Sequence, residues 1–307
     1  MNNRRQFIKK SSLGVLAFTL LPKTSFAKKE NVKITILHTN DTHSHIHPFT
    51  SGKNKGLGGM AQRAGLIKSI RAKERNVLLL DAGDIFQGTP YFNFYGGELE
   101  LKLMSKMKYD AATIGNHDFD NGLEGLQKQL KHAQFPFLIA NYDFSQTILK
   151  NSFKPYKVFK KQGVKIGIFG IGIELQGLVP KKLYGNTIYK DPIEQGNHYA
   201  NLLRKKEKCD LIICLSHLGL KYKTNKISDI TFASKTRNID LIIGGHTHTF
   251  LKKPITIQNL DKEKVLINQV GWGGVNLGRI DFNFNQNRGL KKILSKSIFV
   301  KNKKKYT

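Results

Sequence analysis

Five short apolar stretches of this chain are each followed at once by a cluster of Asp, Asn or His residues. The stretches are rich in β-branched residues and bounded by turn residues, which is typical of buried β-strands. In α/β sheets, functional groups gather where parallel strands end, so the five clusters predict one shared site. The clusters occupy residues 38–43, 81–84, 115–120, 216–217 and 244–248.

Apolar stretches alternate with amphipathic stretches along most of the chain, which predicts an α/β protein with buried sheets. We expect strands at residues 34–37, 77–80, 111–114, 137–139, 165–171, 211–215, 241–243, 265–267 and 278–284. We expect helices at residues 60–73, 99–108, 122–132 and 195–206. No repeat and no Gly/Ser/Pro-rich linker divides residues 32–300, so residues 28–300 are predicted to form one domain, followed by a solvated basic tail at 301–307.

The first 27 residues have the three parts of an export signal: a basic head, an apolar stretch and small residues before a cleavage site. The twin arginine Arg4-Arg5 followed by Gln-Phe-Ile-Lys resembles a twin-arginine signal. The sequence therefore predicts a signal peptide at residues 1–27 and a periplasmic or extracellular protein. No later stretch is apolar and long enough for a transmembrane anchor.

The formal net charge is +29, and removal of residues 1–27, which hold five basic and no acidic residues, leaves +24. Such a charge attracts polyanions, phosphorylated substrates and anionic lipid. The excess is mostly Lys spread along the chain, and no motif that reads nucleic acid interrupts it, so specific nucleic-acid binding is not favoured. Cys214 lies in an apolar stretch, and a disulfide to Cys209 across five residues is geometrically unfavourable.

The residue types in the five clusters are those that hold metal ions. Asp41 and His43 stand two apart on an extended segment and therefore point the same way. Gly83 permits a tight turn from which Asp84 can bridge two ions with its carboxylate oxygens. Mixed carboxylate, amide and imidazole ligands suit Zn, Mn, Fe, Co or Ni better than Ca. The full set of predicted metal ligands is Asp41, His43, Asp84, Asn116, His217, His246 and His248.

Other polar residues of the clusters are left open. His38 and Asn40 can support the ligands or can be buried structural groups. We read His45 and His47 as loop residues, and Asn141 as either an outer contact or structural.

The order Asp-x-His, Gly-Asp, Gly-Asn-His-Asp, His, Gly-His-x-His resembles the calcineurin-like metallophosphoesterases. Flanking residues resemble the 5′-nucleotidase branch of that family, and the likeness covers about residues 32–285. Those flanking stretches are Leu80-Asp81-Ala82-Gly83-Asp84, Phe86-Gln87-Gly88-Thr89, Gly115-Asn116-His117-Asp118-Phe119-Asp120-Asn121-Gly122, Ser216-His217-Leu218-Gly219, Gly244-Gly245-His246-Thr247-His248-Thr249 and, as the closing strand, Gly278-Arg279-Ile280-Asp281-Phe282. The resemblance implies a four-layer αββα sandwich of two mixed sheets.

The resemblance also implies how the residues act. Asp41, His43 and His248 would hold one divalent ion; Asn116, His217 and His246 would hold the other; Asp84 would bridge them. A hydroxide between the ions would attack phosphorus. His117, oriented by Asp120, would steady charge on the leaving oxygen as the catalytic histidine.

Typical exported 5′-nucleotidases carry a second, C-terminal domain that binds the nucleoside, whereas this sequence ends at Thr307. Three interpretations follow. The chain acts alone on small-molecule phosphate esters, nucleotide monoesters or cyclic phosphodiesters; or a separate polypeptide supplies the substrate-binding domain; or the chain is a noncatalytic module that binds metal or polyanions. A related branch that hydrolyses thiosulfonate also has a second domain and is disfavoured.

Overall fold

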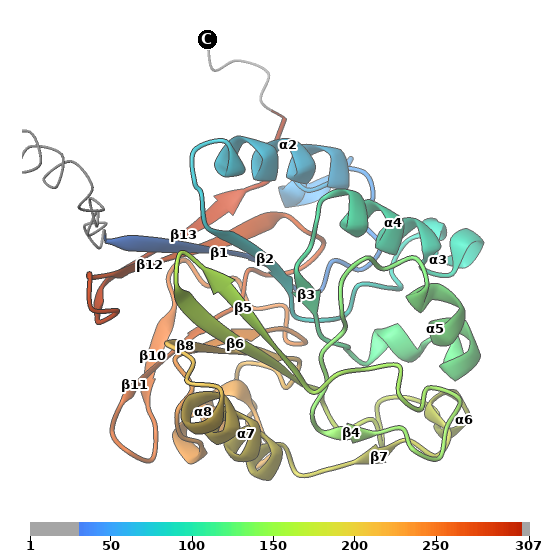
Figure 1. Cartoon of the computed structure of the whole chain (residues 1–307). Coiled ribbons are helices and arrows are strands. Elements are labelled where there is room, and N and C mark those ends of the chain that lie inside the picture. Colours follow the sequence, from blue (N-terminus) through green and yellow to red (C-terminus); the bar gives the residue numbers. More distant parts are fainter. Residues whose placement is uncertain (1–30, 303–307) are drawn as a thin grey trace, which may run out of the picture. The chain divides into compact units, whose positions relative to one another are not determined.

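Two mixed β-sheets face each other in the computed structural model, which describes residues 31–302 (Figure 1). The first sheet has the strand order β13 (Leu290–Phe299), β12 (Asn276–Phe284), β1 (Val32–Thr39), β2 (Val77–Asp81) and β3 (Ala111–Ala112). The strands β1, β2 and β3 run parallel, whereas β12 and β13 are antiparallel to their neighbours.

The second sheet has the strand order β10 (Ile255–Gln258), β11 (Lys264–Asn268), β9 (Leu241–Gly244), β8 (Leu211–Ser216), β6 (Val164–Ile171) and β5 (Tyr156–Lys161). Its central strands β11, β9, β8 and β6 are parallel, and the outer strands β10 and β5 are antiparallel. A small pair, β4 (Tyr142–Asp143) with β7 (Ile188–Tyr189), lies apart from both sheets.

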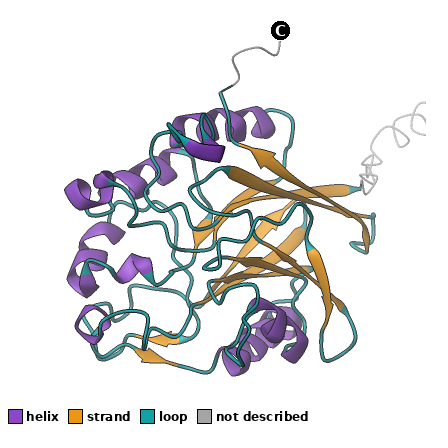
Figure 2. Ribbon diagram, turned by 180° about the vertical axis from the view of Figure 1, so that it is seen from behind, coloured by secondary structure: helices purple, strands orange, loops and turns teal. Residues whose placement is uncertain are grey.

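Helices cover the outer side of each sheet, which gives four layers (Figures 1 and 2). On the side of the first sheet lie α2 (Met60–Arg71), α3 (Pro90–Tyr95), α4 (Glu98–Lys106) and α5 (Gly122–Leu130). On the side of the second lie α7 (Pro192–Asn201), its π-helical continuation η3 (Leu202–Lys206) and α8 (Asp229–Lys235). Short elements η1 (Gly52–Asn54), η2 (His117–Phe119) and α6 (Lys181–Tyr184) lie in the loops. The predicted αββα sandwich of two mixed sheets is confirmed.

The strands β2, β8 and β9 are almost entirely apolar because both of their faces are buried. Successive side chains of a strand point to opposite faces, so Ile34 and Ile36 of β1 pack between the sheets while Leu37 packs against the helices. In β8 the same alternation places Ile213 between the sheets and Cys214 under the outer helices. Both cysteines are free and buried.

Two of the expected strands are shorter or more irregular than predicted. The ladder of β3 covers only Ala111–Ala112. Residues 137–139 do not form a regular strand, because their backbone hydrogen bonds are divided among several partners. Phe137 bridges Ala112, the Leu138 N–H donates to the Ala112 carbonyl, and the Ile139 N–H donates to Lys154.

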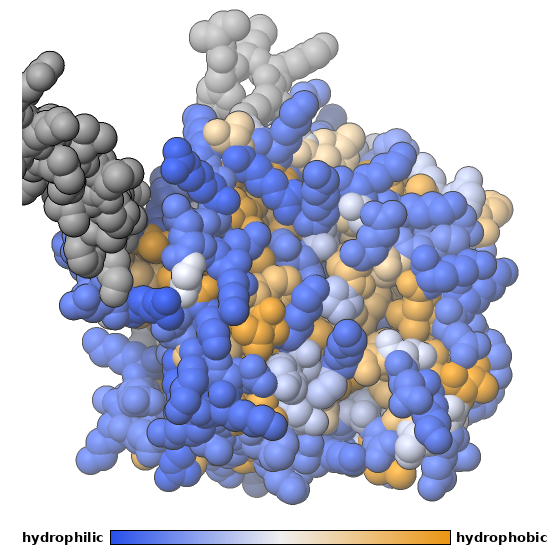
Figure 3. All heavy atoms as spheres, in the orientation of Figure 1, coloured by the Kyte–Doolittle hydropathy of each residue, from blue (hydrophilic) through white to orange (hydrophobic). Residues whose placement is uncertain are grey.

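The strands β5 and β13 form outer edges of the sheets, and sequence analysis did not find them. Both carry exposed lysines, among them Lys157, Lys160, Lys292 and Lys296. Charged edge strands discourage pairing with other chains, which accounts for part of the basic excess. The face that carries β5 is mostly hydrophilic (Figure 3).

The predicted signal peptide and residues 303–307 of the predicted tail lie outside the described residues. No helix in the described part of the chain is both long and apolar enough to cross a membrane.

Candidate dimetal active site

The predicted ligands lie in turns at the carboxyl ends of strands from both sheets, and many of these turns have unusual backbone angles. The expected extended segment at Asp41 and His43 is wrong, because β1 ends at Thr39 and both residues lie in a left-handed turn. Asp41, His43, Asp84, His246 and His248 all have positive φ, between 46° and 71°. This left-handed region costs a non-glycine residue about 1–2 kcal/mol, and such strain gathers at functional sites. Gly83 (φ +88°) completes the turn before Asp84, where a Cβ would lie 2.6 Å from the Gly115 nitrogen.

Asp41, His43 and His248 form a first group whose ligand atoms lie within 4.8 Å of one another. The Nε2 atoms of His43 and His248 are 3.0 Å apart, and Asp41 Oδ1 is 3.5 Å from His248 Nε2. The His43 Nδ1 atom faces the Gln87 carbonyl at 3.2 Å, which favours the tautomer that leaves Nε2 free.

Asp84, His217 and His246 form a second group, also within 4.8 Å. Asn116 joins it, because its Oδ1 lies 2.8 Å from His246 Nδ1. Asp84 Oδ2 is 3.0 Å from His217 Nε2 and 3.8 Å from His43 Nε2, so one carboxylate oxygen faces both groups. The structure therefore brings all seven predicted ligands together, with Asp84 between the groups.

The donor atoms fit metal ions. His217 is fully buried and faces the Ala82 carbonyl through Nδ1 at 2.6 Å. Its Nε2 is buried too and makes no hydrogen bond of acceptable geometry, although Asp84 Oδ2 is close. A buried imidazole nitrogen that faces carboxylates and has no hydrogen-bond partner is suited to a metal ion.

The charges of the site favour the same interpretation. Burial raises the pKa of Asp41, with His217 opposing and the Asp84 charge adding to the rise. Two buried carboxylates this close are both ionised readily only when cations lie beside them. Burial also lowers the pKa of His246 to about 3 and of His248 to about 4, which keeps both imidazoles in the neutral form that binds metal.

His117 stands at the rim of the site and Asp120 orients it. His117 Nδ1 is 2.9 Å from Asp120 Oδ2, and the two ring centroids of His117 and His43 are 5.3 Å apart. The hydrogen bond to Asp120 raises the pKa of His117, against the effect of burial. The pair has the geometry that the predicted catalytic role needs; the role itself stays a prediction.

Asp118 was missed by sequence reasoning as a functional residue. Its buried carboxylate accepts four backbone N–H bonds, from Asp84 (3.1 Å), Ile85 (3.0 Å), Phe86 (3.1 Å) and Gly115 (2.8 Å). It thereby ties the turn after β2 to the turn after β3. The sequence feature that pointed to Asp118 is its position next to Asn116 and His117, in a cluster whose other polar residues are all predicted to be functional.

The structure distinguishes the roles of the polar residues that the sequence could not assign. Asn40 supports the site, because its Nδ2 donates to Asp41 Oδ2 at 2.6 Å. His38 is structural: it is fully buried and contacts Asn268 at 2.9 Å. Asn141 is also structural and exchanges two hydrogen bonds with the backbone of Gly172. His45 stacks on Phe49, and neither His45 nor His47 belongs to the metal groups.

Comparison with known proteins agrees with this geometry. The family described as calcineurin-like phosphoesterase matches residues 34–250. The chain belongs to the calcineurin-like phosphoesterase family. A snake venom 5′-nucleotidase from Crotalus adamanteus is 40% identical over 229 residues, which are 71% of this chain and 37% of that protein. A 5′-nucleotidase from Vibrio cholerae is 38% identical over 237 residues, 74% of this chain and 42% of that protein.

Among solved structures, a 5′-nucleotidase precursor from Thermus thermophilus superimposes with a TM-score of 0.77 at 31% identity. The match covers 87% of this chain and 54% of that one. This member of the calcineurin-like phosphoesterase family thus spans less than half the length of the two 5′-nucleotidases compared by sequence.

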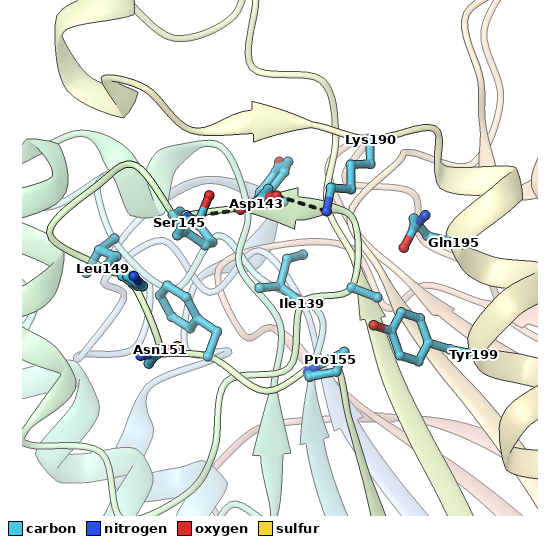
Figure 4. A pocket seen from close by; sticks show the side chains of 14 residues that line it. Ile139, Asp143, Ser145, Leu149, Asn151, Pro155, Lys190, Gln195 and Tyr199 are labelled. Atoms are coloured by element: carbon cyan, nitrogen blue, oxygen red, sulfur yellow. Dashed lines mark hydrogen bonds and ion pairs between the residues drawn. The ribbon is translucent and has the colours of Figure 1, made fainter.

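A cavity of about 270 Å³ lies between the β4 loop, the start of β5 and α7 (Figure 4). The Asp143 carboxylate at its wall pairs with Lys190 at 3.0 Å and accepts from the Ser145 N–H. None of the predicted metal ligands lines it, so it is separate from the dimetal site of this phosphoesterase.

Proposed function

We propose that this chain hydrolyses phosphate esters, with nucleotide monoesters as the main substrate class and cyclic phosphodiesters as a further one, and that it uses two divalent metal ions. The observation that carries the proposal is the meeting of two ligand groups at the single carboxylate of Asp84. The nucleotide preference is supported by the names of the relatives, which are 5′-nucleotidases. Zn, Mn, Fe, Co and Ni all suit the ligand set.

The chain's own residues position the reaction. Two divalent ions, when bound, supply Lewis acidity toward the phosphoryl oxygens and a nucleophilic water at neutral pH. Asp41, His43 and His248 hold one side of the site, and His217, His246 and Asn116 hold the other. Burial of Asp84 and His217 excludes bulk water from beneath the phosphate, which strengthens every electrostatic contact there.

His117 is proposed to act on the leaving group. Its Nδ1 is engaged by Asp120, so Nε2 is the atom that faces substrate. Because Asp120 raises the pKa of His117, the imidazolium is favoured and can steady charge on the leaving oxygen or give it a proton.

Turnover by the purified chain tests the proposal directly. We expect Mn-loaded protein to release phosphate from AMP and to cleave p-nitrophenyl phosphate, and Asp84→Asn to lose most of this activity. Asp261→Asn makes the same chemical change at an exposed position between β10 and β11, so it is the matched control and should behave as wild type. Absence of turnover on AMP, p-nitrophenyl phosphate and its bis ester, with two metals bound, would contradict the proposal.

A separate polypeptide that completes the substrate site is a second proposal. It is supported by exposed aromatic residues on α3, where Phe94 and Tyr95 are 82% and 52% exposed. The helix α3 follows the loop in which Thr89 Oγ1 donates to the Ser44 carbonyl. If the purified chain alone reaches full activity on AMP, this second proposal is wrong.

Export is proposed on the sequence of residues 1–27 alone. Replacement of Arg4 and Arg5 by Lys should retain the protein in the cytoplasm if the twin-arginine route is used. Unchanged export of that variant would point to the general secretory route.

A further inference from the structure

Gln269 follows β11 at the same edge of the second sheet as the turn that carries His246 and His248. The strands β11 and β9 are parallel, with Asn268 opposite Ile243, so Gln269 comes to lie beside this turn. The Gln269 side chain is fully buried. A buried primary amide is costly unless its two N–H groups and its oxygen find partners, so its hydrogen bonds show what it holds in place.

The four side-chain hydrogen bonds of Gln269 reach three residues of that turn and one residue of α8. Its Nε2 donates to the Gly245 carbonyl at 2.9 Å and to Asp229 Oδ2 at 3.1 Å. Its Oε1 accepts from the Thr247 hydroxyl at 3.1 Å and from the Thr249 N–H at 3.2 Å. Both N–H groups and both lone pairs of the oxygen are thereby used.

The bonds to the turn alternate with its two predicted ligands. Gly245, Thr247 and Thr249 stand before, between and after His246 and His248 in the sequence. His246 and His248 have positive φ angles of 71° and 52°, and non-glycine residues keep this conformation only where their surroundings hold it. An amide that bonds to all three intervening positions is placed to hold both histidines in it.

Asp229 extends the same network to the strand that carries His217. Its fully buried carboxylate, in the first residue of α8, accepts from the Ser216 hydroxyl at 2.6 Å as well as from Gln269. Ser216 ends β8 and directly precedes His217. A Cβ on Gly244 would lie 2.1 Å from Asp229 Oδ2, so only glycine lets the backbone approach this carboxylate so closely. Asp229 and Gln269 therefore join two segments that carry predicted ligands.

We propose that Gln269 is a positioning residue of the metal site, which holds His246 and His248 in the orientation that binds metal while Asp229 couples their turn to His217. The inference rests on the proposed dimetal function and adds to it a residue that is not itself a ligand. His246 and His248 belong to different ligand groups, so Gln269 acts on the sites of both ions. A residue that only filled space would contribute to stability and leave the metal affinity of the folded chain unchanged.

Metal affinity of a Gln269 variant tests this role. Gln269→Met removes the four side-chain bonds and nearly keeps the side-chain volume. We expect the folded variant to bind Co²⁺ about 10–100-fold more weakly than wild type, because its ligands lose their supporting contacts. Gln129→Met makes the same change at a buried position on α5 and should keep wild-type affinity. Urea unfolding identifies conditions in which each variant is fully folded, where lower stability alone leaves the affinity unchanged.

Trp272 supplies the signal for the Co²⁺ titration, carried out in competition with a chelator of known affinity. It is the one tryptophan of the sequence, and its ring stacks on the His248 imidazole with centroids 5.9 Å apart and an interplanar angle of 16°. Co²⁺ held by His248 should quench the indole emission, because its partly filled d shell accepts the excitation energy. The midpoint of the titration gives the affinity whatever the starting intensity of each variant.

A second variant tests the same contact from the other side. Thr247→Val removes one of the bonds to Gln269 and should weaken Co²⁺ binding about two- to tenfold, the effect of one hydrogen bond. In the double variant the two effects should combine to less than their product, because they act through a shared contact. If Gln269→Met does not fold, the affinity of Thr247→Val decides alone.

Co²⁺ binding also separates this inference from the proposed function. If wild type binds Co²⁺ and hydrolyses none of the tested esters, the proposed function fails, and the affinity ratios still decide the role of Gln269. Absence of Co²⁺ binding by wild type would overturn both. Wild-type affinity in folded Gln269→Met or in Thr247→Val, an equal loss in Gln129→Met, or full multiplication of the two effects in the double variant would each overturn the inference alone.

Discussion

Replacement of Asp118 by Asn tests whether the turn that holds Asp84 and the turn that holds Asn116 are tied together as the structure shows. Each carboxylate oxygen of Asp118 accepts two backbone N–H bonds: Oδ1 from Ile85 and Phe86, and Oδ2 from Asp84 and Gly115. An amide keeps one oxygen and presents an NH2 group to the other two donors. Two buried donors then lack an acceptor, at about 1–3 kcal/mol each, so we expect a loss of about 2–6 kcal/mol in unfolding free energy.

The same change should weaken metal binding about 10–100-fold, because Asp84 loses the contact that fixes its turn. Urea unfolding and metal titration measure the two effects. Asp110→Asn is the matched control: Asp110 accepts a single backbone bond, from Leu79 at 2.8 Å, which an amide oxygen can keep. If Asp118→Asn is no less stable than Asp110→Asn and binds metal as tightly as wild type, the reasoning is refuted.

Three further changes have defined outcomes. His117→Asn should lower kcat about 10²–10⁴-fold while two metals stay bound, and a variant with wild-type kcat would remove His117 from the mechanism. Gly83→Ala places a methyl 2.6 Å from the Gly115 nitrogen at φ +88°, so we expect at least about 2 kcal/mol of destabilisation in urea; wild-type stability would show that the turn can relax. Burial lowers the pKa of His38 to about 3 from 6.5, so the unfolded chain binds the proton more tightly and stability falls as pH drops from 6.5 toward 3. Urea unfolding at pH 7 and at pH 4.5 measures how much unfolding free energy each protein loses as the pH falls. The loss should be about 2–3 kcal/mol smaller in His38→Gln than in wild type, and equal losses would show that His38 is not the cause.

The parts of the fold that sequence predicted are those whose side chains are buried on both faces. The apolar runs of β1, β2, β6, β8 and β9 could be read directly, because strands covered on both sides need apolar residues throughout. The edge strand β13 reads Leu-Lys-Lys-Ile-Leu-Ser-Lys-Ser-Ile-Phe, and its exposure removes the apolar signal. Its pairing with β12 comes from tertiary context that no local pattern contains.

For the candidate site, too, the sequence predicted only what local patterns contain. Residue types and their order after strands predicted that seven polar side chains would meet at one place, because each stands where a parallel strand ends. The structure brings these seven side chains together, and their role as ligands stays a prediction. The roles of Asp118 and Asn40 depend on contacts across turns that lie far apart in the sequence, such as the Asn40 bond to Gly271. Spacing along one segment contains no information about such a contact.

The most direct test of the dimetal site is X-ray diffraction from metal-soaked crystals at the absorption edge of the bound metal. We predict two anomalous peaks per chain, one among Asp41, His43 and His248, the other among Asn116, His217 and His246, with Asp84 touching both. A single peak, or peaks away from these residues, would contradict the assignment of this site.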